Sequence, residues 1–203
     1  MANSDAIDDG TIAFYRTEAP VYAASGPDGV SRFLETFLER LPEGARILEL
    51  GCGGGRDSQE MLARGFDVLP TDGVPEIARQ AEARIRRPVR VMTFDEMDFC
   101  QEFDAVWANA CLLHVPRPAL PDVLRRVHQA LKLDGLHFAN FKAGGVEGRD
   151  EHDRYFNYLS HGDMLAAYEA SGGWDVIESG DYVGGGYRQF RIPWVKITVR
   201  KRG

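Results

Sequence analysis

The stretch "ILELGCGGGRDS", residues 47–58, decides the fold. Its apolar start predicts a buried strand over 45–50, and four of the next five residues are glycine. Such a turn after a strand lets the backbone fold tightly and approach a bound ligand closely. The residues that follow predict a helix ending at Gly65, because glycine favours the position just past a helix. The stretch therefore predicts a strand, a ligand-binding turn and a helix.

The chain on both sides continues this alternation. Apolar positions from Val30 to Leu41 recur at helical spacing and predict a helix over 28–41, with Asp28 as its N-cap. Downstream, the predicted strands are 66–72, 89–94, 103–109 and 136–141, and the predicted helices are 74–87 and 117–135. Strands that alternate with helices indicate a parallel sheet covered on both faces.

The last third of the chain has a different pattern. It predicts a helix over 160–171 and strands over 174–182 and 193–202, with Gly184–Gly186 in their connection. Since no helical pattern separates these strands, we expect an antiparallel hairpin at the sheet edge. The predicted fold is α/β: a doubly wound, Rossmann-like, mostly parallel seven-stranded sheet that ends in an antiparallel C-terminal hairpin strand.

An acidic residue completes the glycine-rich turn. Asp72 ends the next predicted strand, 21 residues after Gly51, where a carboxylate can accept bonds from the ribose hydroxyls of an adenosine group. A dinucleotide fingerprint needs a third glycine at position 56, which is arginine here. A triphosphate-binding loop needs Gly-Lys-Ser/Thr, whereas this turn continues "GRDS". Both phosphate-binding alternatives are therefore disfavoured.

Four segments in order, "LELGCGGGRDS", "TDG", "FDEMDF" and "FDAVWANACLLHVP", resemble the motifs of class I S-adenosylmethionine-dependent methyltransferases, especially the type 11/12 methyltransferase domains. The resemblance covers roughly residues 30–142 and implies S-adenosylmethionine as cofactor, S-adenosylhomocysteine as product and no metal. It does not specify the methyl acceptor.

The resemblance also implies cofactor-binding residues. It places the backbone of Gly51, Cys52 and Gly53 along the methionine portion, and Asp72 at the ribose. The remaining residues that it brings to the cofactor are Asp95, Glu96 and Met97 beside the adenine, Asn109 and Ala110 beside the sulfonium, Tyr15 and Tyr22 in an N-terminal lid, and Arg56 in the first helical turn. For Tyr15 and Tyr22, the alternative is a frayed arm whose aromatic side chains pack on the core. For Arg56, the alternatives are helix capping and a surface ion pair.

Methyl transfer mainly requires alignment of the nucleophile, and a base only where the nucleophile holds its proton firmly. His114 lies just past the fourth predicted strand, at the sheet edge where ligands bind in α/β folds. It is the candidate base; the alternative is a loop histidine bonded to backbone groups.

The segment 141–160 is long, polar and without a clear secondary-structure pattern, which is typical of functional or mobile loops. Lys142, Arg149, Tyr155 and Tyr158 are its candidate substrate contacts, and they suit an acceptor with an anionic or planar part. A solvated surface loop explains the same composition.

Composition limits the partners. The net charge is 24 − 31 = −7, which argues against nucleic acid. No apolar run approaches the roughly 20 residues that span a bilayer. Three cysteines without a CxxC pair suit a reducing cytoplasm and no metal site. We expect a cytoplasmic monomer or homodimer that acts on a small molecule.

These patterns predict one methyltransferase domain over 1–203: an N-terminal arm (1–29), a cofactor-binding core (30–142) and a substrate-side region (143–203). Two other hypotheses remain open at this point. One is an NAD(P)-dependent oxidoreductase on the same type of sheet, and the other is a non-catalytic domain that binds S-adenosylmethionine.

Overall fold

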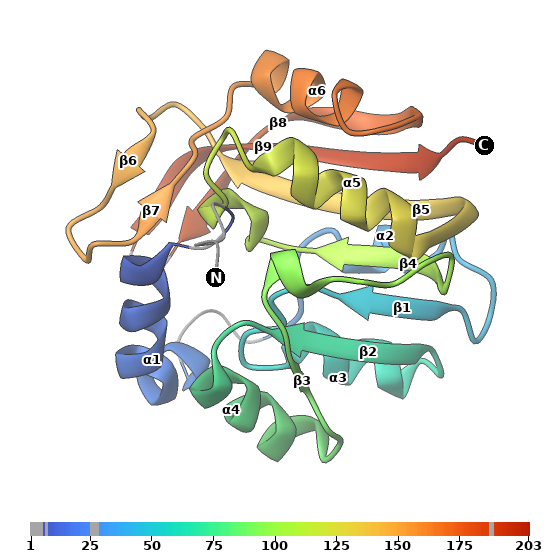
Figure 1. Ribbon diagram of the computed structural model, residues 1–203. Helices are drawn as coiled ribbons and strands as arrows, with labels where there is room; N and C mark the ends of the chain where they lie inside the picture. The colour runs from blue at the N-terminus through green and yellow to red at the C-terminus, as the bar shows by residue number, and fades with distance from the viewer. Residues whose placement is uncertain (1–5, 7, 25–28, 187–188) are drawn as a thin grey trace.

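The structure is a computed structural model that describes residues 6, 8–24, 29–186 and 189–203; side chains at 22–24, 186 and 189–190 are not described. A central seven-stranded sheet has the order β3-β2-β1-β4-β5-β9-β8 (Figure 1). Its strands are β1 (Arg46–Glu49), β2 (Asp67–Asp72), β3 (Arg90–Val91), β4 (Phe103–Ala108), β5 (Leu131–Lys142), β8 (Trp174–Gly186) and β9 (Gln189–Lys201). The first five are parallel, and β9 and β8 are antiparallel, which confirms the predicted fold class.

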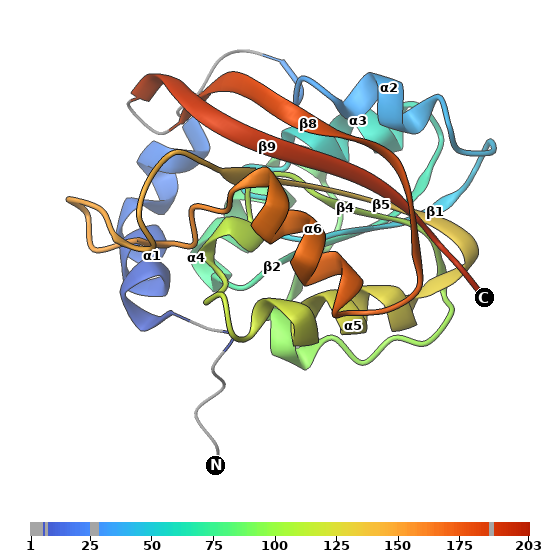
Figure 2. The same cartoon turned by 90° about the horizontal axis from the view of Figure 1, so that it is seen from above.

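Helices cover both faces of this sheet. They are α1 (Asp9–Ala24), α2 (Leu34–Leu38), α3 (Arg56–Ala63), α4 (Pro75–Ile85), α5 (Leu120–Ala130) and α6 (His161–Glu169), with short 3-10 turns η1 (Phe94–Glu96) and η2 (Leu112–His114). Helices α2 and α3 lie on one face and α5 and α6 on the other (Figure 2). Helix α4 packs against α1 and α3. In the part of the chain described, no helix is long and apolar enough to cross a membrane.

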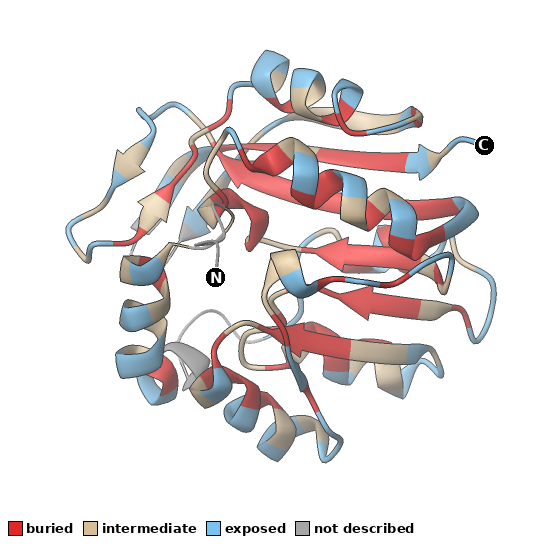
Figure 3. Cartoon of the chain, in the orientation of Figure 1, coloured by how far each residue is buried: buried red, intermediate tan, exposed pale blue. Residues whose placement is uncertain are grey.

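The core lies on the central strands, where buried residues are concentrated (Figure 3). Five of the six residues of β4 are buried because both faces of the sheet are covered. Trp107 of β4 stacks on Phe138 of β5 with ring centroids 4.3 Å apart, and Phe37 of α2 packs against both rings. The carboxyl ends of β1, β2 and β4 are thereby held at one edge.

The helix predicted over 28–41 is much shorter in the structure. Helix α2 spans only Leu34–Leu38, and Val30 is 42% exposed, although Phe37 is buried as predicted. The reason is tertiary: the Ser31 amide donates to the Asp57 carboxylate and its hydroxyl accepts from Asn109, so these polar contacts hold the chain outside a helix. The proposed cap, Asp28, lies outside the described residues.

Other boundaries also differ. Leu131 fits the apolar face predicted for the preceding helix, but it begins β5, where it pairs with Phe103. The C-terminal strands are longer than predicted, so Gly184 lies within β8 and pairs with Ile192 rather than forming the connection. The predicted strand over 89–94 is reduced to Arg90–Val91.

The segment 141–160 is a structured element. It contains a hairpin of β6 (Gly148–Arg149) and β7 (Tyr155–Phe156) beside α1 (Figure 1). Arg154, Phe156 and Asn157 are at most 2% exposed. Residues 144–147, 149, 151 and 153 are exposed, so the segment is solvated in part and anchored by its buried residues.

Candidate cofactor-binding and catalytic site

An open cavity with about 730 Å³ of empty space lies at the carboxyl ends of β1, β2 and β4, beneath α1. The sheet contributes the glycine-rich turn, Asp72 and the residues after β4, and α1 contributes Thr11 and Tyr15. In open α/β sheets this edge is where ligands bind. The fold has therefore brought predicted residues from distant parts of the sequence around one space.

The glycine-rich turn takes backbone conformations that side chains rarely adopt. Gly51 and Gly53, which line the cavity, have φ of +61° and +55°. A Cβ on Gly51 would lie 2.5 Å from the Cβ of Cys111, so the turn and the loop after β4 meet too closely for any side chain. The cavity wall at this point is consequently backbone.

Asp72 links this turn to the end of β2. Its Oδ2 accepts from the Gly53 amide at 3.1 Å and its Oδ1 from the Val74 amide at 2.9 Å. Burial raises the pKa of the carboxyl to about 6, while the two amide bonds oppose the rise. At neutral pH the group is an anion at the cavity wall, and each oxygen retains a lone pair for a ligand hydroxyl.

The residues of the loop after β3 that line the cavity come before the ones that were predicted. Met92, Thr93 and Phe94 line it. Asp95 and Glu96 instead bond to the Thr93 side chain in a capping arrangement at η1. Met97 is 2% exposed and packs in the core.

The loop after β4 forms the opposite wall. Ala110 and Cys111 line the cavity, whereas Asn109 bonds to Ser31 and Asn140 behind it. Cys52 packs against α4, and its amide donates to the Thr71 carbonyl. Arg56 is half-buried at the start of α3.

His114 borders the cavity as a neutral imidazole. Its Nδ1 lies 2.7 Å from the Tyr155 carbonyl, which only accepts, so Nδ1 carries the proton. Nε2 then accepts from the Tyr15 hydroxyl at 3.0 Å. Burial, together with the nearby Arg154 and Lys142, lowers the pKa of His114 to about 4, although the bond to the Tyr155 carbonyl opposes this shift. The Nε2 lone pair of this imidazole is therefore directed to Tyr15 of α1.

The N-terminal segment is helical and covers the cavity. Tyr15 lies on α1 and its ring packs edge-on against His114 at 5.5 Å, so the alternative of a frayed arm is wrong for this residue. Arg16 faces Glu76 of α4 at 3.7 Å. Tyr22 also lies on α1, but its side chain is outside the described part of the structure.

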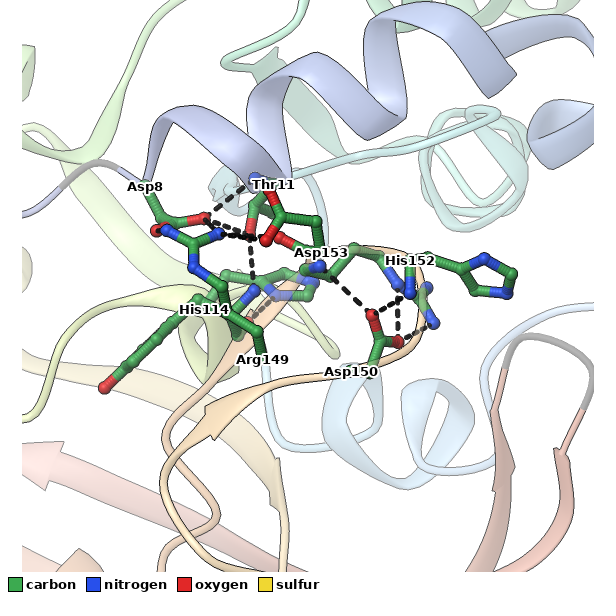
Figure 4. A network of polar contacts seen from close by, with 9 residues as sticks. Asp8, Thr11, His114, Arg149, Asp150, His152 and Asp153 are labelled. Atoms are coloured by element: carbon green, nitrogen blue, oxygen red, sulfur yellow. Dashed lines mark hydrogen bonds and ion pairs between the residues drawn. The ribbon is translucent and has the colours of Figure 1, made fainter.

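The β6–β7 hairpin fastens α1 in place (Figure 4). The Tyr155 amide donates to the Thr11 hydroxyl at 2.9 Å, and Arg149 pairs with Asp8 at 2.6 Å. Asp8 in turn accepts from the Thr11 amide at the start of α1. We call these three contacts, together with the Tyr15–His114 bond, the lid latch.

The candidate substrate residues lie around this latch. Lys142 is 4% exposed, and its ammonium is 3.8 Å from the centre of the Phe156 ring. Burial, and Arg154 nearby, lower the pKa of Lys142 to about 8. The Tyr155 hydroxyl bonds to Glu147, and Tyr158 packs against Phe156. The described lining of the cavity includes neither Lys142 nor Arg149, Tyr155 or Tyr158.

Sequence reasoning missed several residues of the site. Asp8 and Thr11 form a recognisable helix-capping pair at the start of α1, a signal that the sequence offered. Asn140 is a polar residue inside a buried strand, which is also a warning of a specific contact. Across the described residues there is no group of three or more His, Cys, Asp or Glu side chains placed to hold a metal ion.

The chain combines a mostly parallel seven-stranded sheet with a glycine-rich turn and a carboxylate at the end of β2, at the edge where open α/β sheets bind ligands. Residues 47–135 match the family model described as "Methyltransferase domain". This match covers less than half of the chain, and it agrees with the resemblance to class I S-adenosylmethionine-dependent methyltransferases.

Comparison with known proteins gives the same picture. The chain is 35% identical over 113 residues to the ubiquinone biosynthesis O-methyltransferase of Xanthomonas axonopodis pv. citri, covering 52% of this chain and 46% of that one. The corresponding protein of Xylella fastidiosa is 34% identical over 94 residues, covering 42% of this chain and 38% of its own length. The chain thus spans less than half the length of these curated relatives.

Solved structures share the fold. The 1,6-didemethyltoxoflavin-N1-methyltransferase of Burkholderia thailandensis, solved with its substrate and S-adenosylhomocysteine, superposes with a TM-score of 0.78 at 19% identity, covering 96% of this chain and 88% of that one. An S-adenosylmethionine-dependent methyltransferase of Methanosarcina mazei gives a TM-score of 0.75 at 16% identity, covering 86% and 99%.

Proposed function

We propose that this protein transfers a methyl group from S-adenosylmethionine to a small-molecule acceptor. The observation that carries the proposal is the cavity edge at which the backbone of Gly51 and Gly53 adjoins the Asp72 carboxylate. A nucleoside needs both features, a wall without side chains and an anionic acceptor for its ribose. The names of the matched relatives, which are methyltransferases, support the same activity.

Residues of the cavity wall suit each part of this cofactor. Asp72 would accept from the ribose hydroxyls, and Met92–Phe94 would border the adenine in place of the predicted Asp95, Glu96 and Met97. Gly51 and Gly53 would face the methionine portion, opposite Ala110 and Cys111. When bound, S-adenosylmethionine would supply a methyl group attached to a positively charged sulfur, and this sulfur is a good leaving group.

His114 gives the site a proton acceptor. Its Nε2 is unprotonated at neutral pH and borders the cavity. We propose that the acceptor's hydroxyl oxygen bonds to the methyl carbon while the carbon–sulfur bond breaks, its electron pair going to sulfur. The hydroxyl proton passes to His114 Nε2. In the structure, the Tyr15 hydroxyl donates to His114 Nε2. The methyl acceptor must therefore either displace this hydroxyl or pass its proton to Nε2 by way of it.

Two features favour a hydroxyl compound as the acceptor. A neutral imidazole contributes catalysis only where the nucleophile carries a proton, as a phenol does. The relatives from Xanthomonas and Xylella are named O-methyltransferases. We therefore propose a phenolic acceptor that enters beneath α1.

The test is formation of S-adenosylhomocysteine by the purified chain with S-adenosylmethionine and a panel of phenols, catechols, hydroxy acids and aromatic amines. Turnover with a phenol or catechol supports the proposal. Binding of S-adenosylmethionine without turnover on any member would support the non-catalytic alternative instead. Binding of NAD in its place would support the oxidoreductase, against which Arg56 and the antiparallel end of the sheet argue.

A further inference from the structure

Asn140 is a buried polar residue near the carboxyl end of β5, only 3% exposed and bonded to the loop after β4 that forms one wall of the cavity. Its side chain makes three hydrogen bonds. Oδ1 accepts from the Ala110 amide at 2.5 Å, and Nδ2 donates to Asn109 Oδ1 and to the Tyr182 hydroxyl, both at 2.9 Å. Every donor and an acceptor of this side-chain amide are therefore used.

The chemistry of these partners fixes the orientation of the amide. The Ala110 amide is a donor only, so the atom facing it must be the oxygen of Asn140. The nitrogen then faces Asn109 and Tyr182, both of which can accept. An apolar side chain at this position would leave the half-buried Ala110 amide N–H without its acceptor.

Ala110 is the residue that most needs this support. Its φ is +54°, in the left-handed region that residues with a side chain seldom adopt, and it lines the cavity. Such conformations persist only where the surroundings determine them. The bond from Asn140 supplies that constraint at the first residue of the loop that faces the cavity.

The backbone conformation of Ala110 affects the residues that follow it in the cavity wall. Cys111 follows it and presses against Gly51, and the Cys111 carbonyl accepts from the His114 amide at 3.1 Å in η2. A shift of the backbone at Ala110 would therefore move Cys111, which lies against the glycine-rich turn, and also the imidazole of His114. The geometry connects Asn140 to His114 through one short, continuous segment.

The same network reaches the chain that enters α2. Asn109 donates to the Ser31 hydroxyl at 2.7 Å, and the Ser31 amide donates to Asp57 at 2.8 Å. Asp57 also accepts from the Trp107 indole at 2.9 Å. The Asn140 amide on β5 is thus the point at which contacts from the loop after β4 and from β8 converge.

We propose that Asn140 is a positioning residue for methyl transfer, which holds Ala110 in its left-handed conformation and so aligns His114 with the acceptor. This inference rests on the proposed function, because alignment has a consequence only if the chain transfers a methyl group. It assigns no contact between Asn140 and a ligand.

The test compares three variants. Asn140→Ala removes all three bonds, and Asn140→Asp keeps an oxygen that can accept from Ala110. Tyr182→Phe is the matched control, since it removes one bond from the same amide and leaves the Ala110 contact intact. Each is measured for hydrogen exchange at the Ala110 amide, S-adenosylhomocysteine affinity by calorimetry, and kcat and KM with the panel phenol that the wild type methylates fastest.

We expect Asn140→Ala to raise exchange at Ala110 and to lower kcat at least about tenfold, while S-adenosylhomocysteine affinity changes less than about threefold. Asn140→Asp should lie closer to the wild type, and Tyr182→Phe should match it. Unchanged exchange at Ala110 in Asn140→Ala, or a kcat equal to that of Tyr182→Phe, would overturn the inference. A wild type that binds no S-adenosylmethionine overturns the proposed function instead, so the two failures are distinct.

Discussion

At the scale of single residues, burial has opposite effects on two groups of the cavity. It raises the pKa of Asp72 to about 6 and lowers the pKa of His114 to about 4, because desolvation disfavours whichever form is charged. At neutral pH the site therefore holds an anion at one wall and an uncharged imidazole at the other. The anion suits a ribose contact, whereas the lowered pKa keeps the imidazole unprotonated and makes it a weaker base than an exposed histidine.

Asp72→Ala should weaken S-adenosylmethionine binding at least about tenfold, because a hydrogen bond to a charged group contributes about 1.5–3 kcal/mol. Calorimetry on the folded variant measures the change. Asp98→Asn is the control, since Asp98 is 78% exposed and pairs with Arg90 away from the cavity. Equal affinity in wild type and Asp72→Ala would remove the ribose assignment.

His114→Gln should lower kcat by about 10²–10⁴-fold, the usual contribution of a general base, and leave cofactor affinity almost unchanged. Steady-state kinetics with a phenol, together with calorimetry, separates the two quantities. A kcat within threefold of the wild type would show that the acceptor loses its proton without this imidazole.

These residues differ in how far the sequence reveals them. Gly51, Asp72 and His114 lie at or just past the ends of predicted strands. Because the alternation of strands and helices predicts a parallel sheet, these ends are expected at one edge. The part played by Asn140 depends on the φ of Ala110 and on a partner 30 residues away, which no local pattern encodes. The sequence predicts the wall of the cavity but not the network behind it.

At the scale of elements, α1 and the β6–β7 hairpin act together. The predicted N-terminal lid and the segment predicted to touch the substrate meet through Asp8–Arg149, the Thr11–Tyr155 bond and the Tyr15–His114 bond. The cation at Arg149 thus holds the lid rather than facing the cavity. We therefore expect a bound ligand to leave more slowly while these contacts are made.

Arg149→Gln should raise the dissociation rate of S-adenosylhomocysteine about two- to fivefold, because an ion pair with one half-exposed partner contributes about 1 kcal/mol. Stopped-flow displacement measures the rate. Arg125→Gln, which removes an exposed pair within α5, is the matched control. A rate in Arg149→Gln equal to that of the control would mean that the hairpin does not restrain α1.

Element boundaries show where local patterns fail. The α2 pattern is interrupted because Ser31 bonds to Asp57 and Asn109, and Leu131 leaves its helical stripe to pair with Phe103. In both cases the spacing of apolar residues is compatible with a helix and with the observed structure. A tertiary contact therefore decides which of the two forms. The glycines near 184 look like a turn but continue β8, because their ladder with β9 persists.

At the scale of the whole molecule, Glu49 couples stability to pH. It is 2% exposed in β1, and its carboxyl bonds to Ser58. Burial, with the nearby Asp57 and Asp72, raises the pKa of Glu49 to about 8 from an ordinary 4.5. Between these values the folded chain keeps a proton that the unfolded chain releases, so stability falls as pH rises through this window.

Glu49→Gln should remove that loss, because a neutral amide replaces the protonated acid. The free energy of unfolding of the wild type should fall by about 3 kcal/mol between pH 4.5 and 7 from this group. The variant should show a correspondingly flatter profile. Urea unfolding of the cofactor-free protein across this range measures both, and parallel profiles would contradict the assignment.

The central claim is that the glycine-rich turn and Asp72 form a nucleoside site for S-adenosylmethionine. Isothermal titration of the wild-type chain with S-adenosylmethionine, and separately with NAD, tests it most directly. The account predicts saturable binding of S-adenosylmethionine at one site per chain and no measurable heat with NAD. Binding of NAD, or no binding of S-adenosylmethionine by the folded protein, would contradict it.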